Sequence, residues 1–479
     1  MRTTTAERKT QLPSRDPNAA AYNPAMNAIN TRLSIHAQVR MRTMFTSGVV
    51  APARKLAPAM ARKYFGTDGV RGIVGETLTN ELIEKLGKAV ALWSGRGRVF
   101  VGRDTRASGL ELEEAFARGI VSAGGAAVLA GILPTPAVAL LALDVGAVIS
   151  ASHNPPEYNG VKLFDGDGQK LTDETEEEIE ALLDAEGPGG GEIDRIGVAT
   201  DSYLEHITER FGSDLSHLKI AVDCANGAYS DIAPKAFSSL GAAVIAIGVE
   251  PDGTNINVGC GATDLRVLQQ TVTSNRLDLG IAFDGDGDRM LAVDATGNVV
   301  DGDQIVAILA LHLGVDRVVV TVMSNLGLHK LLEEHAIDVV TTPVGDRYVL
   351  DALLKTGGLL GGEQSGHIVY LRDHVTGDGL ASALLLCDAV RGTTLEEAAA
   401  QMPKFPQVKE NLPLRGGILP VSLDEAVARL NEELDGTARV LVRPSGTEPV
   451  VRLLAEAPTE AEARQLCGSI AALVRRELG

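Results

Sequence analysis

From residue 62 to the C-terminus, short apolar runs alternate with longer amphipathic stretches, and this alternation constrains the fold more than any other feature. The apolar runs have the length of strands, and the stretches between them have the length of helices. Strands that run into polar loops are predicted at 98–104, 145–151, 219–227, 277–289 and 317–325, and a helix at 111–124. Alternation of this kind predicts an α/β fold, with mostly parallel sheets covered by helices on both faces.

Three segments rich in glycine, proline or polar residues divide the pattern into four blocks: 185–197, 294–303 and 404–417. The blocks look like loose repeats of one plan, a strand, a polar loop, a helix and a strand. We therefore predict α/β domains at 62–198, 199–298 and 299–410, with mostly parallel mixed sheets. A smaller α+β domain is predicted at 411–479.

Residues 1–61 differ from the rest of the chain. They contain nine Lys or Arg residues but only Glu7 and Asp16 as acids, whereas the whole chain has a net charge of −19. A basic, acid-poor segment has the composition of a transit peptide. We favour instead upstream sequence read from a start codon placed too early, with Met60 as the natural start, and a disordered tail as the next alternative.

Charge and cysteine content exclude several classes of protein. A net charge of −19 argues against non-specific nucleic-acid binding. Four widely spaced cysteines argue against a disulfide framework or a zinc site and favour a reducing, cytoplasmic location. The uncharged stretch 119–143 is long enough to span a membrane, but Gly124, Gly125, Pro134 and Pro136 interrupt it. We expect no membrane span.

A serine follows the predicted strand 145–151. Ser152, His153 and Asn154 precede Pro155 and Pro156, so they are expected on a stiff loop at the carboxyl end of a strand. Ligands of open α/β sheets bind at such ends. The serine could be a nucleophile there, but taken alone it is better explained as the N-cap of a following helix.

Three aspartates crowd the loop DGDGDR at 284–289. Asp284, Asp286 and Asp288 alternate with glycines after a buried strand, and such carboxylates repel one another unless a cation neutralises them. Hard oxygen ligands suit Mg²⁺ or Ca²⁺, and the calcium loop is excluded because no bidentate glutamate follows. A simple hairpin turn is the alternative, but the spacing favours a metal site.

Two further loops carry polar groups between glycines. The loop at 357–370 contains Glu363, Gln364, Ser365 and His367, which suit recognition of a sugar or, alternatively, form an ordinary turn. The loop RPSGTEPVVR at 443–452 combines two arginines with hydroxyls, as phosphate sites do. Its alternative is a surface turn with an Arg–Glu448 pair.

Eight motifs, taken in order, resemble the α-D-phosphohexomutase superfamily. They are FGTDGVRG, ISASHNP, DCANGA, DGDGDR, VGDRYVL, GGEQSGH, VTGDG and RPSGTEP, and the resemblance runs from about Lys63 to the C-terminus. It implies a four-domain, heart-shaped phosphohexomutase architecture, with three similar α/β domains and a smaller α+β domain around a central cleft. One loop from each domain would meet in that cleft.

The resemblance also implies roles for the loop residues. Ser152 would be the phosphoserine, and its phosphate would bind one Mg²⁺ per subunit together with Asp284, Asp286 and Asp288. The catalytic centre would be lined by Arg71, His153, Lys162 and Arg289. Substrate would be bound by Glu363, Ser365 and His367 at the sugar and by Arg443, Ser445, Gly446, Thr447 and Arg452 at the phosphate.

The motif GEQSGH resembles the glucosamine branch of the superfamily. This implies an isomerase that interconverts glucosamine 6-phosphate and 1-phosphate for peptidoglycan precursors, after priming by a kinase or a hexose bisphosphate. A homodimer is compatible with the resemblance. The alternatives are a phosphomannomutase/phosphoglucomutase, a Mg²⁺-dependent phosphatase with Asp284 as nucleophile, and a catalytically silent sugar-phosphate sensor.

Overall fold

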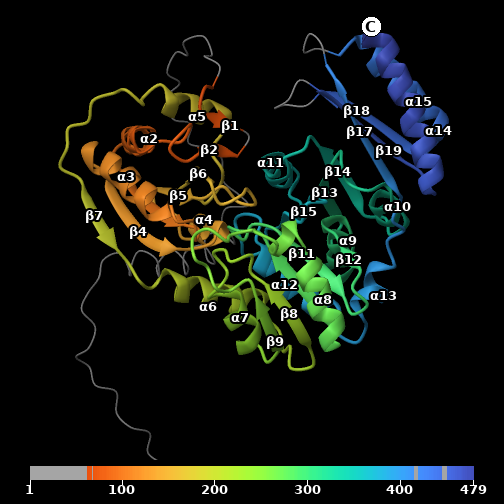
Figure 1. Cartoon of the computed structure of the whole chain (residues 1–479), viewed down its shortest axis with the longest axis horizontal. Helices are drawn as coiled ribbons and strands as arrows, with labels where there is room; N and C mark the ends of the chain where they lie inside the picture. The colour runs from red at the N-terminus through yellow and green to blue at the C-terminus, as the bar shows by residue number, and fades with distance from the viewer. Residues whose placement is uncertain (1–61, 67, 415–418, 445–449, 479) are drawn as a thin grey trace, which may run out of the picture. The chain divides into compact units, whose positions relative to one another are not determined.

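The structure of the chain is a computed structural model. This structure describes residues 62–66, 68–414, 419–444 and 450–478. The predictions for residues 1–61 and for Ser445, Gly446 and Thr447 therefore lie outside the described residues. The described part of the chain forms four sheets, each built from one continuous portion of the sequence (Figure 1).

The first sheet has seven strands in the order β1-β2-β6-β5-β3-β4-β7. They are β1 (Phe65–Gly66), β2 (Gly69–Ile73), β3 (Arg98–Arg103), β4 (Ala126–Ile132), β5 (Val145–Ile149), β6 (Tyr158–Asp165) and β7 (Glu192–Arg195). Strands β5, β3, β4 and β7 are parallel, whereas β6 runs antiparallel to β5. Every residue of β5 is buried, as expected for a central strand with helices on both faces.

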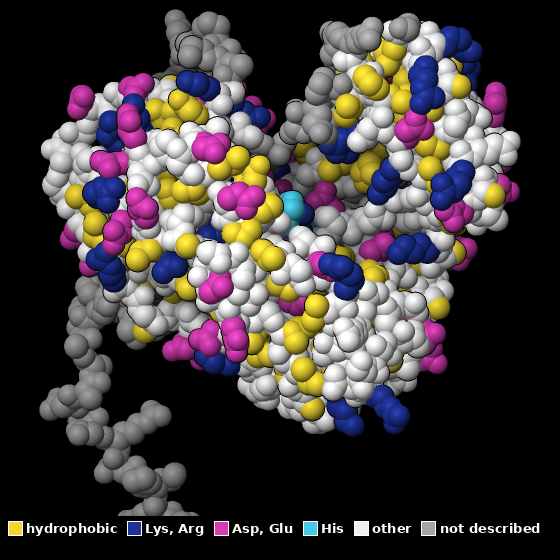
Figure 2. Space-filling model, viewed as in Figure 1, with side chains coloured by type: hydrophobic (Ala, Val, Ile, Leu, Met, Phe, Trp, Pro, Cys, Tyr) yellow, Lys and Arg dark blue, Asp and Glu magenta, His cyan; other side chains and the backbone are white. Residues whose placement is uncertain are grey.

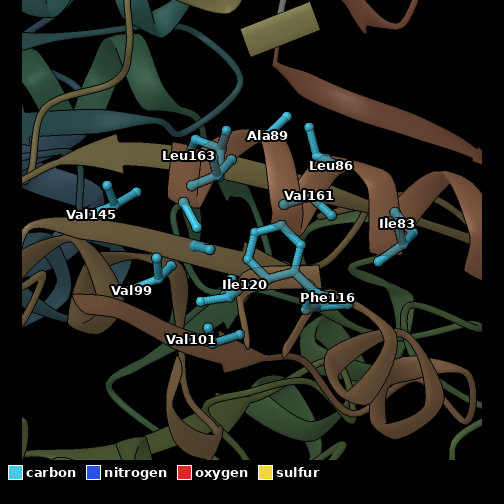
Figure 3. Close-up of a cluster of buried hydrophobic side chains, with 14 of the residues drawn as sticks. Ile83, Leu86, Ala89, Val99, Val101, Phe116, Ile120, Val145, Val161 and Leu163 are labelled. Carbon is cyan, nitrogen blue, oxygen red and sulfur yellow. The ribbon is translucent and has the colours of Figure 1, made fainter. Parts of the chain in front are cut away.

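Helices α2 (Asn80–Trp93) and α3 (Gly109–Ser122) pack against this sheet. Ile83, Leu86, Phe116 and Ile120 from these helices meet the side chains of Val99, Val101, Val145, Val161 and Leu163 from the strands (Figure 3). Shorter helices complete the domain: α4 (Thr135–Leu140), α5 (Asp173–Glu180) and, leading into the next domain, α6 (Ala199–Phe211). The buried core holds β5, and with it the start of the serine loop, in a fixed place.

The second sheet has five strands in the order β12-β11-β10-β8-β9. They are β8 (Lys219–Asp223), β9 (Ala243–Ile247), β10 (Leu279–Phe283), β11 (Met290–Asp294) and β12 (Val299–Val300), with α7 (Ala233–Ser239), the 3-10 helix η2 (Gly261–Thr263) and α8 (Arg266–Asn275) between them. Strand β10 is wholly buried, parallel to β8 and antiparallel to β11.

The third sheet has four strands in the order β14-β13-β15-β16. They are β13 (Arg317–Thr321), β14 (Asp338–Thr342), β15 (Leu360–Gly362) and β16 (Ile368–Tyr370), and the helices are α9 (Gly302–Leu313), α10 (Leu326–Glu334), α11 (Asp346–Thr356), α12 (Gly379–Ala389) and α13 (Leu395–Ala399). Strand β15 is parallel to β13 and antiparallel to β16.

The C-terminal sheet is antiparallel, in the order β17-β19-β18. It consists of β17 (Gln407–Pro413), β18 (Arg439–Pro444) and β19 (Val450–Glu456), with α14 (Val421–Leu434) and α15 (Glu460–Leu478) packed on it. These four sheets agree with the α/β class and the four-part architecture expected from the sequence.

All three segments expected to divide the blocks contain strands, and 294–303 includes the short strand β12. The glycine-rich segment 185–197 includes β7, a fully exposed edge strand that pairs with β4. The segment 404–417 includes β17, which pairs with β19 along its whole length, so the boundary predicted at residue 411 falls inside a strand. Strands β7 and β17 were obscured by glycine, proline and charged residues, because an edge strand needs little apolar character.

Within the described ranges, none of the helices combines the length and the apolar character that a membrane span requires. The uncharged stretch 119–143 is divided among α3, β4 and α4. Cys224, Cys260, Cys387 and Cys467 are buried free thiols.

Candidate active site

All four loops singled out in the sequence join an antiparallel pair of strands. The serine loop lies between β5 and β6, the aspartate loop between β10 and β11, and the loop with Glu363 between β15 and β16. Strands β18 and β19, which precede and follow residues 445–449 in the sequence, are also antiparallel. A second strand therefore follows the serine loop and the loop with Glu363, where the repeated plan of strand, loop and helix predicted a helix.

Ser152 does not cap a helix, because β6 follows the serine loop. It is fully buried and has a left-handed backbone, with φ of 53°. Its Oγ donates a hydrogen bond to Asp284 Oδ2 at 2.6 Å, which joins the serine loop to the aspartate loop. A non-glycine residue held at positive φ indicates a strained backbone of the kind found at functional sites.

A buried arginine holds the serine loop from behind. Arg106 Nε donates to Asp104 Oδ2 at 2.9 Å, and its remaining four N–H groups donate to backbone carbonyls. These carbonyls belong to Ser152 (2.9 Å), Asn154 (2.8 Å), Tyr158 (2.9 Å) and Pro155. Four of the five donors of the guanidinium therefore fix the serine loop, and the fifth pairs with Asp104.

Ser150 and Asn257 complete this support. Ser150 Oγ accepts from Ser152 N at 2.9 Å and donates to Asp104 Oδ2 at 2.6 Å. Asn257 Nδ2, from the second domain, donates to the carbonyl of Ser152 at 2.9 Å. The sequence reasoning missed these residues and Arg106, although GRDTR directly follows a predicted strand end.

His153 and Arg71, two of the residues predicted to line the catalytic centre, contact the serine loop. His153 Nδ1 is 3.2 Å from Ser152 Oγ. Burial, with the charges of Arg289 and Arg71, lowers the pKa of His153 to about 4, so its ring is neutral near pH 7. Arg71 contacts Asn154 Oδ1 at 3.5 Å and pairs with Asp68.

The three aspartates lie together and are buried. Asp284, Asp286 and Asp288 each offer an oxygen within 4.8 Å of the others. Asp286 Oδ1 and Asp288 Oδ1 are buried and accept no hydrogen bond from the described residues. Burial, reinforced by the charges of Asp288 and Asp286, raises the pKa of Asp284 well above its usual range. Crowded carboxylates with buried, unused oxygens fit a divalent cation.

Lys162 is the main positive partner of this loop. Its Nζ lies 2.8 Å from both Asp286 Oδ2 and Asp288 Oδ2, and 3.3 Å from Asp68 Oδ2. Although burial alone would lower the pKa of Lys162, these carboxylates raise it well above its usual value. The resemblance implied that Lys162 lines the catalytic centre; in the structure it lies on β6, beside β5, and pairs with the aspartates.

Thr135 ties the aspartate loop to the first domain. Its backbone N donates to the Asp286 carbonyl at 2.8 Å and its Oγ1 to Asp286 Oδ2 at 2.6 Å. Sequence reasoning read the surrounding PTP only as a turn, and nothing local to it signals this contact. The aspartate loop is thus positioned by both domains.

The third loop packs against the second one. Met290 N donates to the Gly366 carbonyl at 3.0 Å, and Arg289 forms a β-bridge with His367. His367 is buried, with Nδ1 3.8 Å from Asp288 Oδ1 and Nε2 3.6 Å from Asp346 Oδ2. Of the predicted substrate residues in this loop, His367 therefore contacts the aspartate loop.

Glu363 and Ser365 differ in exposure. Glu363 is buried and accepts from Gly345 N at 3.0 Å, whereas Ser365 is exposed. The Glu363 charge also acts on Arg289, whose pKa lies above its usual value mainly because Asp288 and Asp284 outweigh the opposing effect of burial. These two loops thus share one charged environment, and a hollow with acidic side chains and a histidine is visible in the middle of the face in Figure 2.

Sequence reasoning also missed a lysine between the first and third domains. Lys170 is largely buried, with Nζ 2.5 Å from Asp68 Oδ1 and in contact with Asp346 of α11. Nothing in the sequence around Lys170 signals this position. It adds a second buried cation beside Lys162.

The predicted phosphate loop is described only at its ends. Arg443 of β18 and Arg452 of β19 are directly paired across the strands. Burial and the charge of Arg452 lower the pKa of Arg443. Like charges directly opposite one another destabilise a sheet, so this pair is suited to an anion.

Nearly the whole described chain matches one family of known proteins. Residues 62–188, 201–297 and 301–405 match the family "Phosphoglucomutase/phosphomannomutase" in its alpha/beta/alpha domains I, II and III, and residues 394–473 match its C-terminal domain. The phosphoglucosamine mutase of Pelotomaculum thermopropionicum is 48% identical over 438 residues, covering 86% of this chain and 98% of that protein. That of Geobacillus thermodenitrificans is 44% identical over 444 residues, covering 87% and 99%.

Solved structures agree with this result. A phosphoglucomutase/phosphomannomutase family protein from Burkholderia thailandensis has a TM-score of 0.74 at 26% identity, covering 87% of this chain and 96% of that one. A putative phosphomannomutase from Thermus thermophilus has a TM-score of 0.73 at 28% identity, covering 86% and 98%. The chain belongs to the phosphoglucosamine mutase family within the α-D-phosphohexomutase superfamily.

Proposed function

We propose that this chain interconverts glucosamine 6-phosphate and glucosamine 1-phosphate through a phosphoserine at Ser152 and a 1,6-bisphosphate intermediate. The observation that carries the proposal is the 2.6 Å hydrogen bond from Ser152 Oγ to Asp284 Oδ2. It puts a buried serine hydroxyl, at the carboxyl end of a central strand, against three carboxylates from another domain. A phosphoryl carrier needs such a hydroxyl beside a cation site.

One Mg²⁺ per subunit fits Asp284, Asp286 and Asp288 together with an oxygen of the phosphoserine. Three carboxylates leave octahedral positions for phosphate oxygens, and hard oxygen ligands suit this ion. When bound, Mg²⁺ would offset the negative charge of the transferring phosphoryl group.

The chain's own residues support the transfer. The sugar C1 hydroxyl attacks the phosphorus of phosphorylated Ser152; its O–P bond forms as the P–Oγ bond breaks, and Oγ regains a proton as the sugar hydroxyl loses one. His153 Nδ1, neutral and 3.2 Å from Oγ, is placed to exchange that proton. Lys162 and Arg289 supply fixed positive charge at the same loop.

The bisphosphate must then turn end for end, so that its 6-phosphate faces Ser152. A single phosphate cradle has to accept either end of the sugar. Arg443 and Arg452 are suited to this role, and Ser445, Gly446 and Thr447 are proposed to complete it. Glu363 and Ser365 are proposed to bind sugar hydroxyls, with His367 between them and the metal loop.

Other parts of the proposal rest on the sequence and the resemblance. They are priming of Ser152 by a kinase or a hexose bisphosphate, a homodimer, a cytoplasmic location and a role in supplying peptidoglycan precursors. The buried free thiols support a reducing compartment.

The proposal is tested by a ³¹P NMR time course with Mg²⁺. Glucosamine, glucose and mannose 6-phosphates are offered separately to enzyme primed with the matching bisphosphate. Fastest growth of a 1-phosphate signal from the glucosamine compound is expected. Faster conversion of glucose or mannose phosphate would favour the phosphomannomutase/phosphoglucomutase alternative, and release of inorganic phosphate alone would favour a phosphatase.

A further inference from the structure

The segment 374–379 takes no part in the proposed reaction, yet it lies directly behind the aspartate loop. Gly379 N donates to the Gly287 carbonyl at 3.0 Å. A Cβ added to Gly379 would lie 2.8 Å from the Arg289 carbonyl oxygen and 2.9 Å from that of Gly287. The start of α12 is therefore in contact with the backbone of the loop, at a distance that only glycine permits.

Asp378 is the centre of a buried polar network in this segment. It is 2% exposed, and its carboxylate accepts five hydrogen bonds or ion-pair contacts. The donors are Tyr203 Oη (2.7 Å), Tyr229 Oη (2.8 Å), Leu380 N (2.8 Å), Ala381 N (3.0 Å) and His374 Nε2 (3.0 Å). Although burial alone would raise the pKa of Asp378, these donors, His374 first, lower it. The buried carboxylate is therefore fully satisfied and ionised.

Tyr229 connects this carboxylate to the aspartate loop. A Cβ on Gly287, in the middle of the loop, would lie 2.3 Å from Tyr229 Cε2, so the ring packs directly against the loop backbone. The same ring lies 4.8 Å, centroid to centroid, from Phe283, the last residue of β10. The Tyr229 side chain thus contacts both the start and the middle of the turn that carries Asp284 and Asp286.

Gly377 provides a second path from the same segment. A Cβ on Gly377 would lie 2.2 Å from His367 Nε2, so the backbone of Gly377 packs directly against the His367 ring. His367 Nδ1 in turn is 3.8 Å from Asp288 Oδ1. Segment 374–379 therefore also contacts the surroundings of Asp288, through His367.

The network also joins two domains. Tyr203 lies on α6 and Tyr229 follows β8, whereas His374 and Asp378 belong to the third domain. A purely structural role would be to hold these domains together and to cap α12. Stability alone does not require it, because replacing buried polar networks by apolar side chains is often neutral or stabilising. What a fully satisfied polar network adds is fixed geometry.

We infer that Asp378 and Tyr229 are positioning residues that set the mutual distances of Asp284, Asp286 and Asp288 for a divalent cation. This inference rests on the metal site proposed above. It gives a specific role to VTGDG, which was only a marker of resemblance in the sequence. Asp378 orients Tyr229, while Gly377 and Gly379 let the segment approach His367 and the loop.

The test is direct binding of Mn²⁺, followed by electron paramagnetic resonance of the free ion, to full-length protein without substrate. Asp378→Asn places an amide N–H₂ among five donors, and Tyr229→Phe removes one hydroxyl but keeps the ring. Both variants are expected to bind Mn²⁺ about 10- to 100-fold more weakly than wild type, the range for residues that orient metal ligands. KM for the sugar phosphate should change much less.

Asp388→Asn is the matched control. Asp388 also lies on α12 and pairs with His312 at 3.1 Å, but it is at the partly exposed far end of the helix. This variant should bind Mn²⁺ like wild type. Thermal unfolding is measured for all proteins, and Tyr229→Phe remains informative if Asp378→Asn fails to fold.

Unchanged Mn²⁺ affinity in Tyr229→Phe and Asp378→Asn, with only a lowered unfolding temperature, would overturn the inference and leave the network a structural link. Equal binding by wild type and Asp284→Asn would instead show that the proposed metal site is wrong. The inference would then fall with it. The two failures are thus distinguishable.

Discussion

Ser152 and Asp284 are 132 positions apart, lie in different domains and share a 2.6 Å hydrogen bond. Each residue lies in a loop that follows a fully buried strand, β5 for Ser152 and β10 for Asp284. The bond therefore places two rigid sheet ends at a fixed separation. Because both partners are buried, the geometry is preorganised, as efficient phosphoryl transfer requires.

Replacing Ser152 with alanine removes the proposed phosphoryl acceptor. We expect turnover to fall by a factor on the order of 10⁴ to 10⁶, the scale for loss of a nucleophile. The unfolding temperature should change little, because one hydrogen bond contributes about 1 kcal/mol. ³¹P NMR and circular dichroism measure the two effects, and Ser469→Ala, on the exposed face of α15, is the control for a lost hydroxyl. Unchanged turnover in Ser152→Ala would refute the assignment.

Replacing Asp284 with asparagine should have opposite effects with and without metal. Burial, reinforced by repulsion from Asp288 and Asp286, raises the pKa of Asp284, so a neutral side chain there should stabilise the protein in chelator. The same change removes a proposed ligand, so saturating Mg²⁺ should no longer raise the unfolding temperature. In wild type, ion at about 100 times its Kd adds about 2.7 kcal/mol. Calorimetry with and without Mg²⁺ tests this, and stabilisation of both proteins by the ion would contradict it.

Arg106→Lys tests the support of the serine loop. Lysine has three N–H donors and lacks the fork, so it cannot serve Asp104 and four carbonyls at once. We expect a loss of about 3 kcal/mol in stability, typical of breaking a buried charge pair, and a fall in kcat larger than any change in KM. Arg118→Lys is the control: Arg118 is exposed and pairs with Glu84, so this change should leave stability and kcat unchanged. Equal stability and equal kcat in the two variants would show that the serine loop keeps its conformation without Arg106.

The sequence was informative where chemistry follows a buried strand directly. The three aspartates were predicted as a metal site because the apolar run LGIAF marks a central strand, and polar residues at its end face a cleft. Ser152, after the apolar run VGAVI, was assigned its role by the resemblance, because the pattern alone favoured an N-cap. The serine loop was expected to lead to a helix, as in the repeated plan. It leads to the antiparallel strand β6, whose polar and small residues weaken the apolar signal of a strand.

Contacts between distant segments could not be predicted. Arg106 reaches carbonyls about fifty positions away, and Tyr229 meets Asp378 at a separation of 149. Backbone carbonyls carry no sequence signature, so nothing local marks Arg106 as their partner. Lys162 was singled out, but its carboxylate partners depend on how the first two domains meet.

Arg443→Gln tests the predicted anion site. The pKa of Arg443 is lowered by burial and by Arg452, and an anion between the two guanidiniums would relieve their repulsion. Losing one charged hydrogen bond of about 1.5–3 kcal/mol should raise KM roughly 10- to 150-fold. Sulfate should also protect wild type against thermal unfolding more than the variant. Arg439→Gln is the control, because Arg439 pairs with Glu456. An equal rise in KM in this variant would argue against a specific phosphate site.

Asp303 gives a pH dependence of stability outside the proposed active site. Burial, reinforced by the nearby Asp301, raises the pKa of Asp303 to about 7. A carboxyl whose pKa is raised by folding binds its proton more tightly in the folded state. Its contribution to stability is therefore complete below the ordinary pKa of 3.8 and is lost as the pH rises through about 7. Near neutral pH, the buried charge opposes folding.

Asp303→Asn removes this titration while keeping an oxygen that can accept from Asn325 N, 2.8 Å away in wild type. The unfolding temperature of wild type minus that of the variant should decrease steadily from pH 5 to pH 8. Differential scanning calorimetry at unit steps of pH measures the trend, and Asp388→Asn, whose carboxylate has a lowered pKa, is the control. Parallel curves for wild type and Asp303→Asn would mean that Asp303 stays ionised in the fold, with its charge balanced by Asn325 N and the other donors around it.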